Sequence, residues 1–143
     1  MRRREDAMKL SVRNLSLVFV AGLWGGLLNG LVVWLFGRLG IAPALGVHIA
    51  PPLTTGLLYP KLVWGGIWGL LFLVPLGRLS WTAKGLIFSL GPTLVQLFWV
   101  FPLQAHQGNL GLHLGALTPL FVLFYNAVWG VAAGWWLQWA RKD

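Results

Sequence analysis

The sequence contains no cysteine, and only three of its 143 residues are acidic. The lack of cysteine excludes disulfide bonds, thiolate nucleophiles and Cys-ligated metal clusters. The acidic residues are Glu5, Asp6 and Asp143, so the long stretch between residues 6 and 143 carries no carboxylate side chain. General acid–base catalysis by paired carboxylates is therefore excluded, and so is proton-coupled antiport through a carboxylate inside the membrane.

Two further signatures of enzymes are missing. The sequence has no glycine-rich phosphate-binding loop, and its few hydroxyl residues are not part of a Ser-His-Asp arrangement. We therefore expect no catalytic residue, no metal site and no enzyme activity. We also expect no cofactor, apart from the haem alternative considered with the histidines below.

Charge of either sign is scarce, and this defines the class of protein. Charged residues make up 10% of the chain and hydrophobic residues 57%, with a mean hydropathy of +0.73. Soluble domains have about 25% charged residues. Four apolar stretches approach or exceed the roughly 20 residues that cross a bilayer as a helix. They cover residues 14–37, 57–76, 85–102 and 117–140. We predict an all-α membrane protein, with a basic tail at residues 1–13 and one four-helix transmembrane domain at 14–143.

The basic residues predict how the chain is oriented. Five of the eleven lie in the first thirteen residues, Arg141 and Lys142 close the chain, and Arg78 and Lys84 lie in or beside the middle turn. Loops rich in Lys and Arg stay in the cytoplasm. We therefore expect a multi-pass protein of the bacterial inner membrane with both termini cytoplasmic. Anionic lipid headgroups are expected partners, and nucleic acid is not, because basic and aromatic residues do not alternate on a polar face.

An internal repeat organises the chain. A Gly-x-His motif at residues 46–48 recurs at 111–113, and a Val-Trp-Gly motif at 63–65 recurs at 128–130, in each case 65 residues later. Each copy contains two apolar stretches, so the fold is predicted to be two tandem helical hairpins that enter the membrane in the same direction. A parallel repeat of this kind has a pseudo-twofold axis along the membrane normal. The first repeat covers about residues 14–77, and the second covers about residues 83–140.

Glycines spaced four residues apart predict helix faces that pack closely. The first span carries three such glycines, and each of the other two faces carries a pair. These are Gly22, Gly26 and Gly30, then Gly65 and Gly69, and finally Gly130 and Gly134. We expect the two pairs, which are equivalent in the repeat, to meet near the axis. The three-glycine ladder exceeds what four spans need internally, so it is expected to contact a second copy of the chain or a larger membrane complex.

A few polar residues interrupt the apolar spans. Asn29 lies beside the glycine ladder and is costly in the membrane unless a partner helix satisfies it, so it is either an interhelical contact or a ligand contact. Lys61 lies near the outer end of the second span and can extend its ammonium toward the surface. Asn126 occupies the position equivalent to Lys61 in the second repeat. Lys61 and Asn126 are candidate ligand-binding residues at the hairpin interface.

The three histidines, His48, His106 and His113, all fall in the predicted outer loops. Imidazole suits zinc or copper, but no acidic residue is near to complete a metal site. Two histidines facing each other across the axis could also ligate a b-type haem. A third interpretation is pH sensing, because histidine changes charge between about pH 5 and pH 8. The alternative to all three is that the side chains hydrogen-bond within the loops and the interface.

The second half of the chain resembles a known family. It reads Trp81-Thr82-Ala83-Lys84-Gly85-Leu86, then Gly91-Pro92, Gln96-Leu97-Phe98 and Phe101-Pro102-Leu103, and it ends with a Trp-rich helix closing on Arg141 and Lys142. This half resembles the YagU-type small bacterial inner-membrane proteins, in which a Trp-led Lys/Gln-Gly-Leu turn opens a helix that ends in Phe-Pro. The resemblance implies a role linked to acid resistance, which favours the interpretation of the histidines as pH sensors.

Three functions are compatible with these observations. The first is an assembly or accessory component of the membrane that packs through its Gly-rich helix faces. The second is a transporter or channel for a small neutral or anionic solute, with its site at the hairpin interface near Lys61, Asn126 and the two repeated histidines. The third is a haem-binding or metal-binding membrane subunit.

Overall fold

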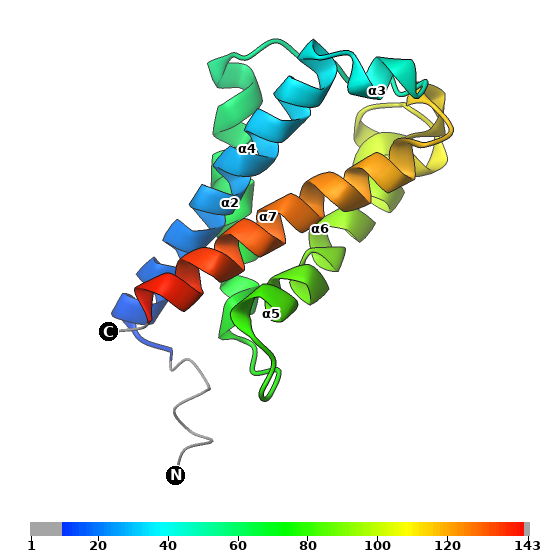
Figure 1. Cartoon of the computed structure of the whole chain (residues 1–143). Helices are drawn as coiled ribbons and strands as arrows, with labels where there is room; N and C mark the ends of the chain where they lie inside the picture. The colour runs from blue at the N-terminus through cyan, green and yellow to red at the C-terminus, as the bar shows by residue number, and fades with distance from the viewer. Residues whose placement is uncertain (1–9, 142–143) are drawn as a thin grey trace.

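The computed structural model describes residues 10–141 and is built from helices, with no strand in that part of the chain (Figure 1). Four helical segments are long and apolar enough to cross a membrane: Val12–Arg38, Thr55–Leu73, Trp81–Gln104 and Thr118–Ala140. The prediction of an all-α membrane protein built as two tandem hairpins is confirmed. Most of the predicted basic tail (residues 1–9) and Lys142 lie outside the described residues.

The helices follow one another as two hairpins with short helical pieces in the connections. In chain order they are α2 (Val12–Arg38), α3 (Ile41–Ala44), α4 (Thr55–Gly69), η1 (Leu70–Leu73), α5 (Trp81–Phe88), α6 (Leu90–Val95), η2 (Gln96–Gln104), η3 (Asn109–Leu114) and α7 (Thr118–Ala140). We call the end of the bundle that holds residues 10 and 141 the terminal end, and the opposite end, with residues 39–54 and 105–117, the loop end. Figure 1 shows the two hairpins diverging toward the loop end.

Hydroxyl side chains fix where three of the helices begin. Ser11 Oγ accepts the amide N–H of Asn14 at 3.2 Å, and Thr54 Oγ1 accepts that of Leu57 at 3.2 Å. Ser80 Oγ accepts the amide N–H of Ala83 at 3.1 Å. Such N-caps satisfy amides that have no partner inside the helix. The third span consequently begins at Trp81, four residues before the predicted residue 85.

The third span is not a single α-helix. It consists of α5, α6 and the π-helix η2, with the break between α5 and α6 at Ser89. Pro92 explains the break, because it has no N–H to donate to the carbonyl oxygen of Phe88 four residues earlier. The break therefore lies three residues before the proline. Gln96 begins η2 and accepts a hydrogen bond from Asn126 on α7.

The glycine faces pack within each hairpin. A Cβ atom on Gly65 would come within 2.6 Å of the carbonyl oxygen of Gly22, and one on Gly69 would overlap the carbonyl oxygen of Val18. In the second hairpin, a Cβ atom on Gly130 would overlap the carbonyl oxygen of Gly85. The helices of each hairpin therefore touch backbone to backbone, which only glycine permits at such close approach.

Two predictions about the glycines are thus wrong. The Gly65/Gly69 and Gly130/Gly134 pairs do not meet at the axis, because α4 packs on α2, and Gly134 packs on Trp81 of α5. The glycine ladder on α2 is also used inside the molecule, because Gly26 lies against the carbonyl oxygen of Lys61 on α4. A second copy or a larger complex remains a prediction, but it has to use a surface other than this ladder.

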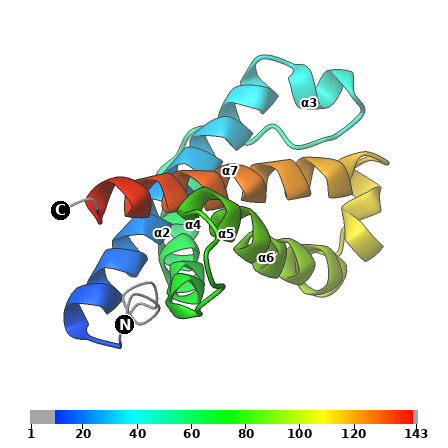
Figure 2. The ribbon, with the colours of Figure 1, turned by 60° about the horizontal axis from the view of Figure 1, so that its bottom comes forward.

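Helices α2 and α7 form the centre of the molecule, and Figure 2 shows them crossing. Gly25 on α2 leaves room for the Trp129 side chain, whose Nε1–H donates to the carbonyl oxygens of Gly22 at 3.2 Å and Gly65 at 3.3 Å. Around this point lies an apolar core that includes Val18, Phe72, Phe88, Ala133 and Leu137. The segments α4 and α6–η2 flank this centre on either side.

At the loop end the two connections touch each other. The backbone N–H of His48 donates to the carbonyl oxygen of Leu114 at 2.7 Å, and a Cβ atom on Gly115 would overlap the carbonyl oxygen of Gly46. Val47 is completely buried in a second apolar cluster with Val33 and Phe121. Ala42 and Val47 therefore anchor the segment 38–56 on the bundle, while most of its other residues are exposed.

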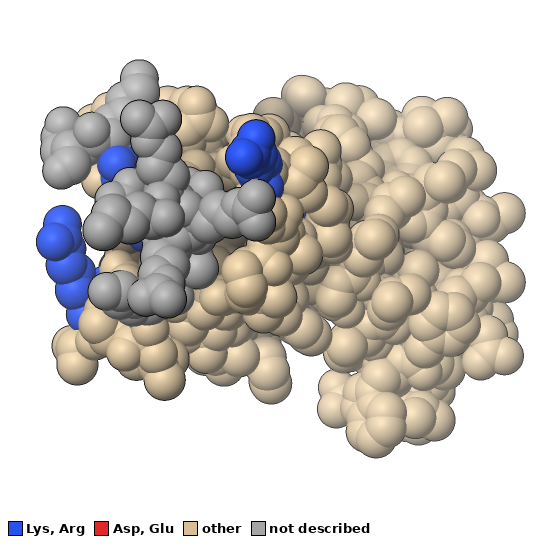
Figure 3. Space-filling view, turned by 90° about the horizontal axis from the view of Figure 1, so that it is seen from below, with Lys and Arg blue, Asp and Glu red and all other residues tan. Residues whose placement is uncertain are grey.

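Basic side chains gather at the terminal end. Arg13 lies in the first turn of α2, Arg78 lies in the turn before α5, Lys84 lies in the first turns of α5, and Arg141 follows α7. Figure 3 views this end from below and shows Lys and Arg side chains beside the grey residues. Lys84 and Arg141 both lie over the ring of Trp81, at 4.2 and 5.2 Å from its centroid. The terminal end is therefore the more basic end of the described molecule.

Candidate functional site

The candidate site centres on Lys61, on the second turn of α4. Its side chain turns into the bundle, and Nζ donates a hydrogen bond of 2.9 Å to Asn29 Oδ1 on α2. Asn29 Nδ2 in turn donates to the carbonyl oxygen of Tyr125 on α7 at 2.7 Å. The expectation that the Lys61 ammonium extends to the surface is wrong, because Asn29 offers it an acceptor inside the bundle. Asn29 is an interhelical contact, as one of its two interpretations required.

Gly30 has a specific role beside this lysine. A Cβ atom on Gly30 would lie 3.1 Å from Lys61 Cδ and 2.9 Å from Leu58 Cδ2. The third glycine of the predicted ladder therefore leaves space for the aliphatic part of the lysine side chain. A larger residue here would push that chain away from Asn29.

The second hairpin carries a related polar group. Asn126 on α7 donates through Nδ2 to Gln96 Oε1 at 2.7 Å and to Thr93 Oγ1 at 3.1 Å. Thr93 Oγ1 donates to the carbonyl oxygen of Ser89 at 2.7 Å. Lys61 and Asn126 are equivalent in the repeat, and each hydrogen-bonds to the other spanning segment of its own hairpin. The two groups differ in charge, because only Lys61 is cationic.

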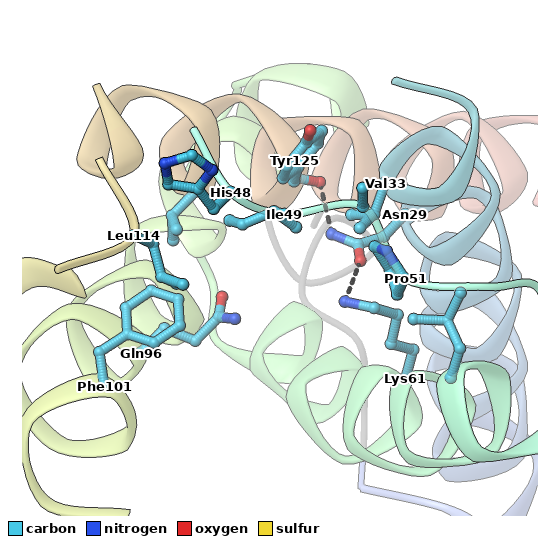
Figure 4. A pocket seen from close by; sticks show the side chains of 13 residues that line it. Asn29, Val33, His48, Ile49, Pro51, Lys61, Gln96, Phe101, Leu114 and Tyr125 are labelled. Carbon is cyan, nitrogen blue, oxygen red and sulfur yellow. Dashed lines mark hydrogen bonds between the residues drawn. The ribbon is translucent and has the colours of Figure 1, made fainter. Parts of the chain in front are cut away.

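Two cavities of about 480 and 490 Å³ meet at these polar groups. Both are lined by Asn29, Leu57, Lys61 and Gln96. The first extends toward the loop end, where residues 48–51 and Leu114 line it (Figure 4). The second lies between α4 and the α6–η2 segment and also includes Asn126. Such volumes fall in the usual range of about 300–1,000 Å³ for small-molecule sites.

The charge of the site is unbalanced. Lys61 is the one charged side chain that lines either cavity, and residues 10–141 contain no Asp or Glu. An ammonium group has three N–H donors, and within the described residues Asn29 Oδ1 is the one acceptor bonded to Lys61 Nζ. In Figure 4 the Gln96 amide points from the opposite wall into the same space. The arrangement offers hydrogen-bond donors and a positive charge to an anion.

The structure does not bring the three histidines together. The exposed His48 lines the first cavity, but Figure 4 places its ring on the side away from Lys61. His106 and His113 lie in the second loop and line neither cavity. Positive φ angles at His106 (54°) and Leu110 (60°) interrupt the loop, so it is not a continuous helix that would place His106 and His113 on one face. Across residues 10–141, no three His, Cys, Asp or Glu side chains form a group that could hold a metal ion.

Of the predicted site residues, the structure thus places Lys61 and Asn126 at the second cavity and His48 at the first. pH sensing by the histidines stays an untested prediction. Thr93 and the Gln96 amide were not among the predicted site residues. Their signal is present in the sequence, because Thr93 and Gln96 are three residues apart in an otherwise apolar span and so share a helical face.

The fold and the site define a multi-pass all-α membrane protein with a cationic polar cavity between two hairpins. No protein-family model matches the chain, and neither does any curated protein or solved structure. The function is therefore inferred from the geometry of the site itself.

Proposed function

We propose that the protein is a transporter that binds a small anionic molecule at Lys61, between its two hairpins. The observation that carries the proposal is an ammonium group with one hydrogen-bond acceptor and no carboxylate in the described chain. A lone charge in a membrane-spanning helix is costly, and such residues commonly mark ion or substrate pathways. A bound anion would offset that cost and would accept the remaining hydrogen bonds of the ammonium.

The repeat supports a transport role. In transporters built from repeats, the substrate site lies where the repeats meet. Here Lys61 and Asn29 come from the first hairpin, and Gln96 and Asn126 come from the second. The two cavities that meet at Lys61 extend in different directions, which gives a bound molecule two routes away from the site.

The test is binding followed by flux. Purified protein in mild detergent would be heated with inorganic phosphate, acetate, decanoate or dihexanoyl phosphatidic acid. We expect at least one of these anions to raise the melting temperature of the wild type and of Arg38→Met, which removes an exposed charge outside both cavities. Lys61→Met should abolish the shift, and Lys61→Arg should keep part of it. The proposal is refuted if every anion that raises the melting temperature of the wild type raises that of Lys61→Met by the same amount.

Transport is then measured with the anion that binds. Liposomes containing the protein should move that anion faster than empty liposomes, and Lys61→Met should reduce the rate to the empty-liposome level. Equal rates with Lys61→Met and wild-type protein, both correctly inserted, would rule out transport through this site.

We also propose the bacterial inner membrane as the location, with both termini in the cytoplasm. Support comes from the basic side chains at the terminal end, because basic segments stay cytoplasmic. The chain lacks cysteine, so single cysteines can report the orientation. In intact cells, a membrane-impermeant maleimide should label Ala105→Cys at the loop end and leave Leu79→Cys at the terminal end unlabelled. The reverse labelling would invert the proposed topology.

A further inference from the structure

The second cavity is a groove with two helical walls. Its floor is formed by Asn29 on α2 and by Asn126 and Trp129 on α7, and its walls are α4 and the α6–η2 segment. The walls are apolar over most of their area, with Trp64 on one side and Trp99 on the other. These two indoles are 59% and 56% exposed, although both line the groove. The side of the groove opposite α2 and α7 is therefore bordered by side chains that face outward.

Toward the terminal end the groove is closed. Trp68 of α4 lies in contact with Gly91 of α6, because a Cβ atom on Gly91 would be 3.2 Å from Trp68 Cζ3. Below this contact the ring centroids of Phe72 and Phe88 are 5.2 Å apart. The groove thus ends in packed aromatic side chains and has its mouth toward the side of the bundle, where the hydrocarbon of the bilayer lies.

Lys61 lies beside this polar floor and near the loop-end start of α4. Lys61 is six positions after Thr55, the first residue of α4, which is about 9 Å along a helix. The headgroup layer on each side of a bilayer is about 5–8 Å thick. Trp64 and Trp99 are exposed near this level, where tryptophan prefers the membrane interface. If Thr55 is placed at the outer edge of the headgroup layer, Lys61 comes close to the boundary between headgroups and acyl chains.

We propose that the anion bound at Lys61 is the headgroup phosphate of an anionic phospholipid that enters from the bilayer between α4 and η2. Its phosphate receives hydrogen bonds from Lys61 Nζ and the Gln96 amide, and its acyl chains leave the groove between Trp64 and Trp99. This inference rests on the proposed function and specifies its ligand. Charge complementarity selects an anionic lipid, because the groove is lined by a cation and by no acidic side chain. The apolar side mouth favours a ligand with acyl chains over free phosphate.

Native mass spectrometry of the full chain tests this inference. The protein, delipidated in mild detergent, is mixed with equal amounts of dioleoyl phosphatidylglycerol and dioleoyl phosphatidylcholine, and separately with inorganic phosphate. We expect one phosphatidylglycerol adduct on the wild type and on Arg38→Met, in excess over phosphatidylcholine. Lys61→Met should weaken that adduct roughly tenfold or more, the scale of one charged hydrogen bond. Trp99→Ala should weaken it several-fold without changing phosphate binding.

The outcomes separate this inference from the proposed function. Lys61-dependent binding of phosphate without any phosphatidylglycerol adduct would overturn the lipid assignment and leave the anion site intact. Equal binding of both lipids, or a phosphatidylglycerol adduct that Lys61→Met retains, would also overturn it. If neither anion depends on Lys61, both proposals fail. Should Lys61→Met not fold, Gln96→Glu replaces it, because it keeps the acceptor for Asn126 and places a carboxylate in the groove.

Discussion

The indole Nε1–H of Trp129 donates a hydrogen bond of 3.2 Å to the carbonyl oxygen of Gly22. This bond joins α7 to α2 across the boundary between the two hairpins, at the place where Gly25 leaves space for the indole ring. The same N–H also lies 3.3 Å from the carbonyl oxygen of Gly65 on α4, the other helix of the first hairpin. One side chain of the second hairpin therefore contacts both helices of the first.

Trp129→Phe removes this donor and keeps an aromatic ring. We expect the free energy of unfolding in detergent to fall by at least about 0.6 kcal/mol, the average for hydrogen bonds between membrane helices, with a further loss because phenylalanine fills less of this buried site. Titration with a denaturing detergent, followed by circular dichroism, measures it. Trp139→Phe, at a 61% exposed position, is the control. The assignment of the bond is wrong if the two variants unfold alike.

Gly65→Ala tests the close contact of α2 and α4. The added Cβ would come within 2.6 Å of the carbonyl oxygen of Gly22, which is backbone and cannot rotate away. We expect a loss of about 1–3 kcal/mol, as for overpacked cores. Gly56→Ala is the matched control in the same helix, because its Cβ would meet only Thr54 Oγ1, at an ordinary 3.6 Å. Equal stability of the two variants would argue against this packing.

Gln96→Glu should supply the missing counter-ion from inside the protein. The carboxylate keeps an acceptor for Asn126 and faces the cavity that Lys61 lines. We expect it to compete with external anions, so that the anion-induced rise in melting temperature disappears while the fold persists. Gln138→Glu, an exposed change of the same chemistry on α7, should leave the rise unchanged. An undiminished response in Gln96→Glu would contradict the assignment of the anion site.

Asn126 and Gln96 should be energetically coupled. Their hydrogen bond of 2.7 Å joins α7 to η2, and a double-mutant cycle of Asn126→Ala and Gln96→Ala isolates its contribution. We expect a coupling free energy of about 0.5–1.5 kcal/mol from unfolding titrations. Replacing Asn126 and Leu94 instead gives a reference cycle, because the exposed Leu94 makes no hydrogen bond through its side chain. A coupling no larger than in that reference would show that the bond contributes nothing.

The four spans could be predicted because length and apolar composition alone decide whether a helix crosses a bilayer. Their starts were less accurate, since the capping hydroxyls of Thr54 and Ser80 lie outside the apolar runs. The pairing of the glycine faces was predicted wrongly. A small-xxx-small pattern marks a face that packs closely, but it does not identify the partner, and here the partners of Gly65 and Gly130 lie within their own hairpins.

The site was predicted in part. Lys61 and Asn126 could be selected because polar residues are rare in the spans and these two are equivalent in the repeat. The direction of the Lys61 side chain could not be predicted from the sequence, because an ammonium near a helix end can turn either to the surface or to an acceptor inside the protein. That choice is set by Asn29, whose position depends on how α2 packs against α4. The three histidines were predicted as candidate ligand-binding or pH-sensing residues, and in the structure all three are exposed.

The hydrogen bond between the backbones of His48 and Leu114 has a mechanical consequence. Residues 74–80 join the hairpins covalently at the terminal end, and this contact joins them again at the loop end. The two hairpins are therefore connected at both ends of the polar cavity. These two connections oppose separation of the hairpins from each other. A molecule arriving from the side does not have to break either connection, and any yielding needed to admit it is confined to the flanking segments α4 and α6–η2.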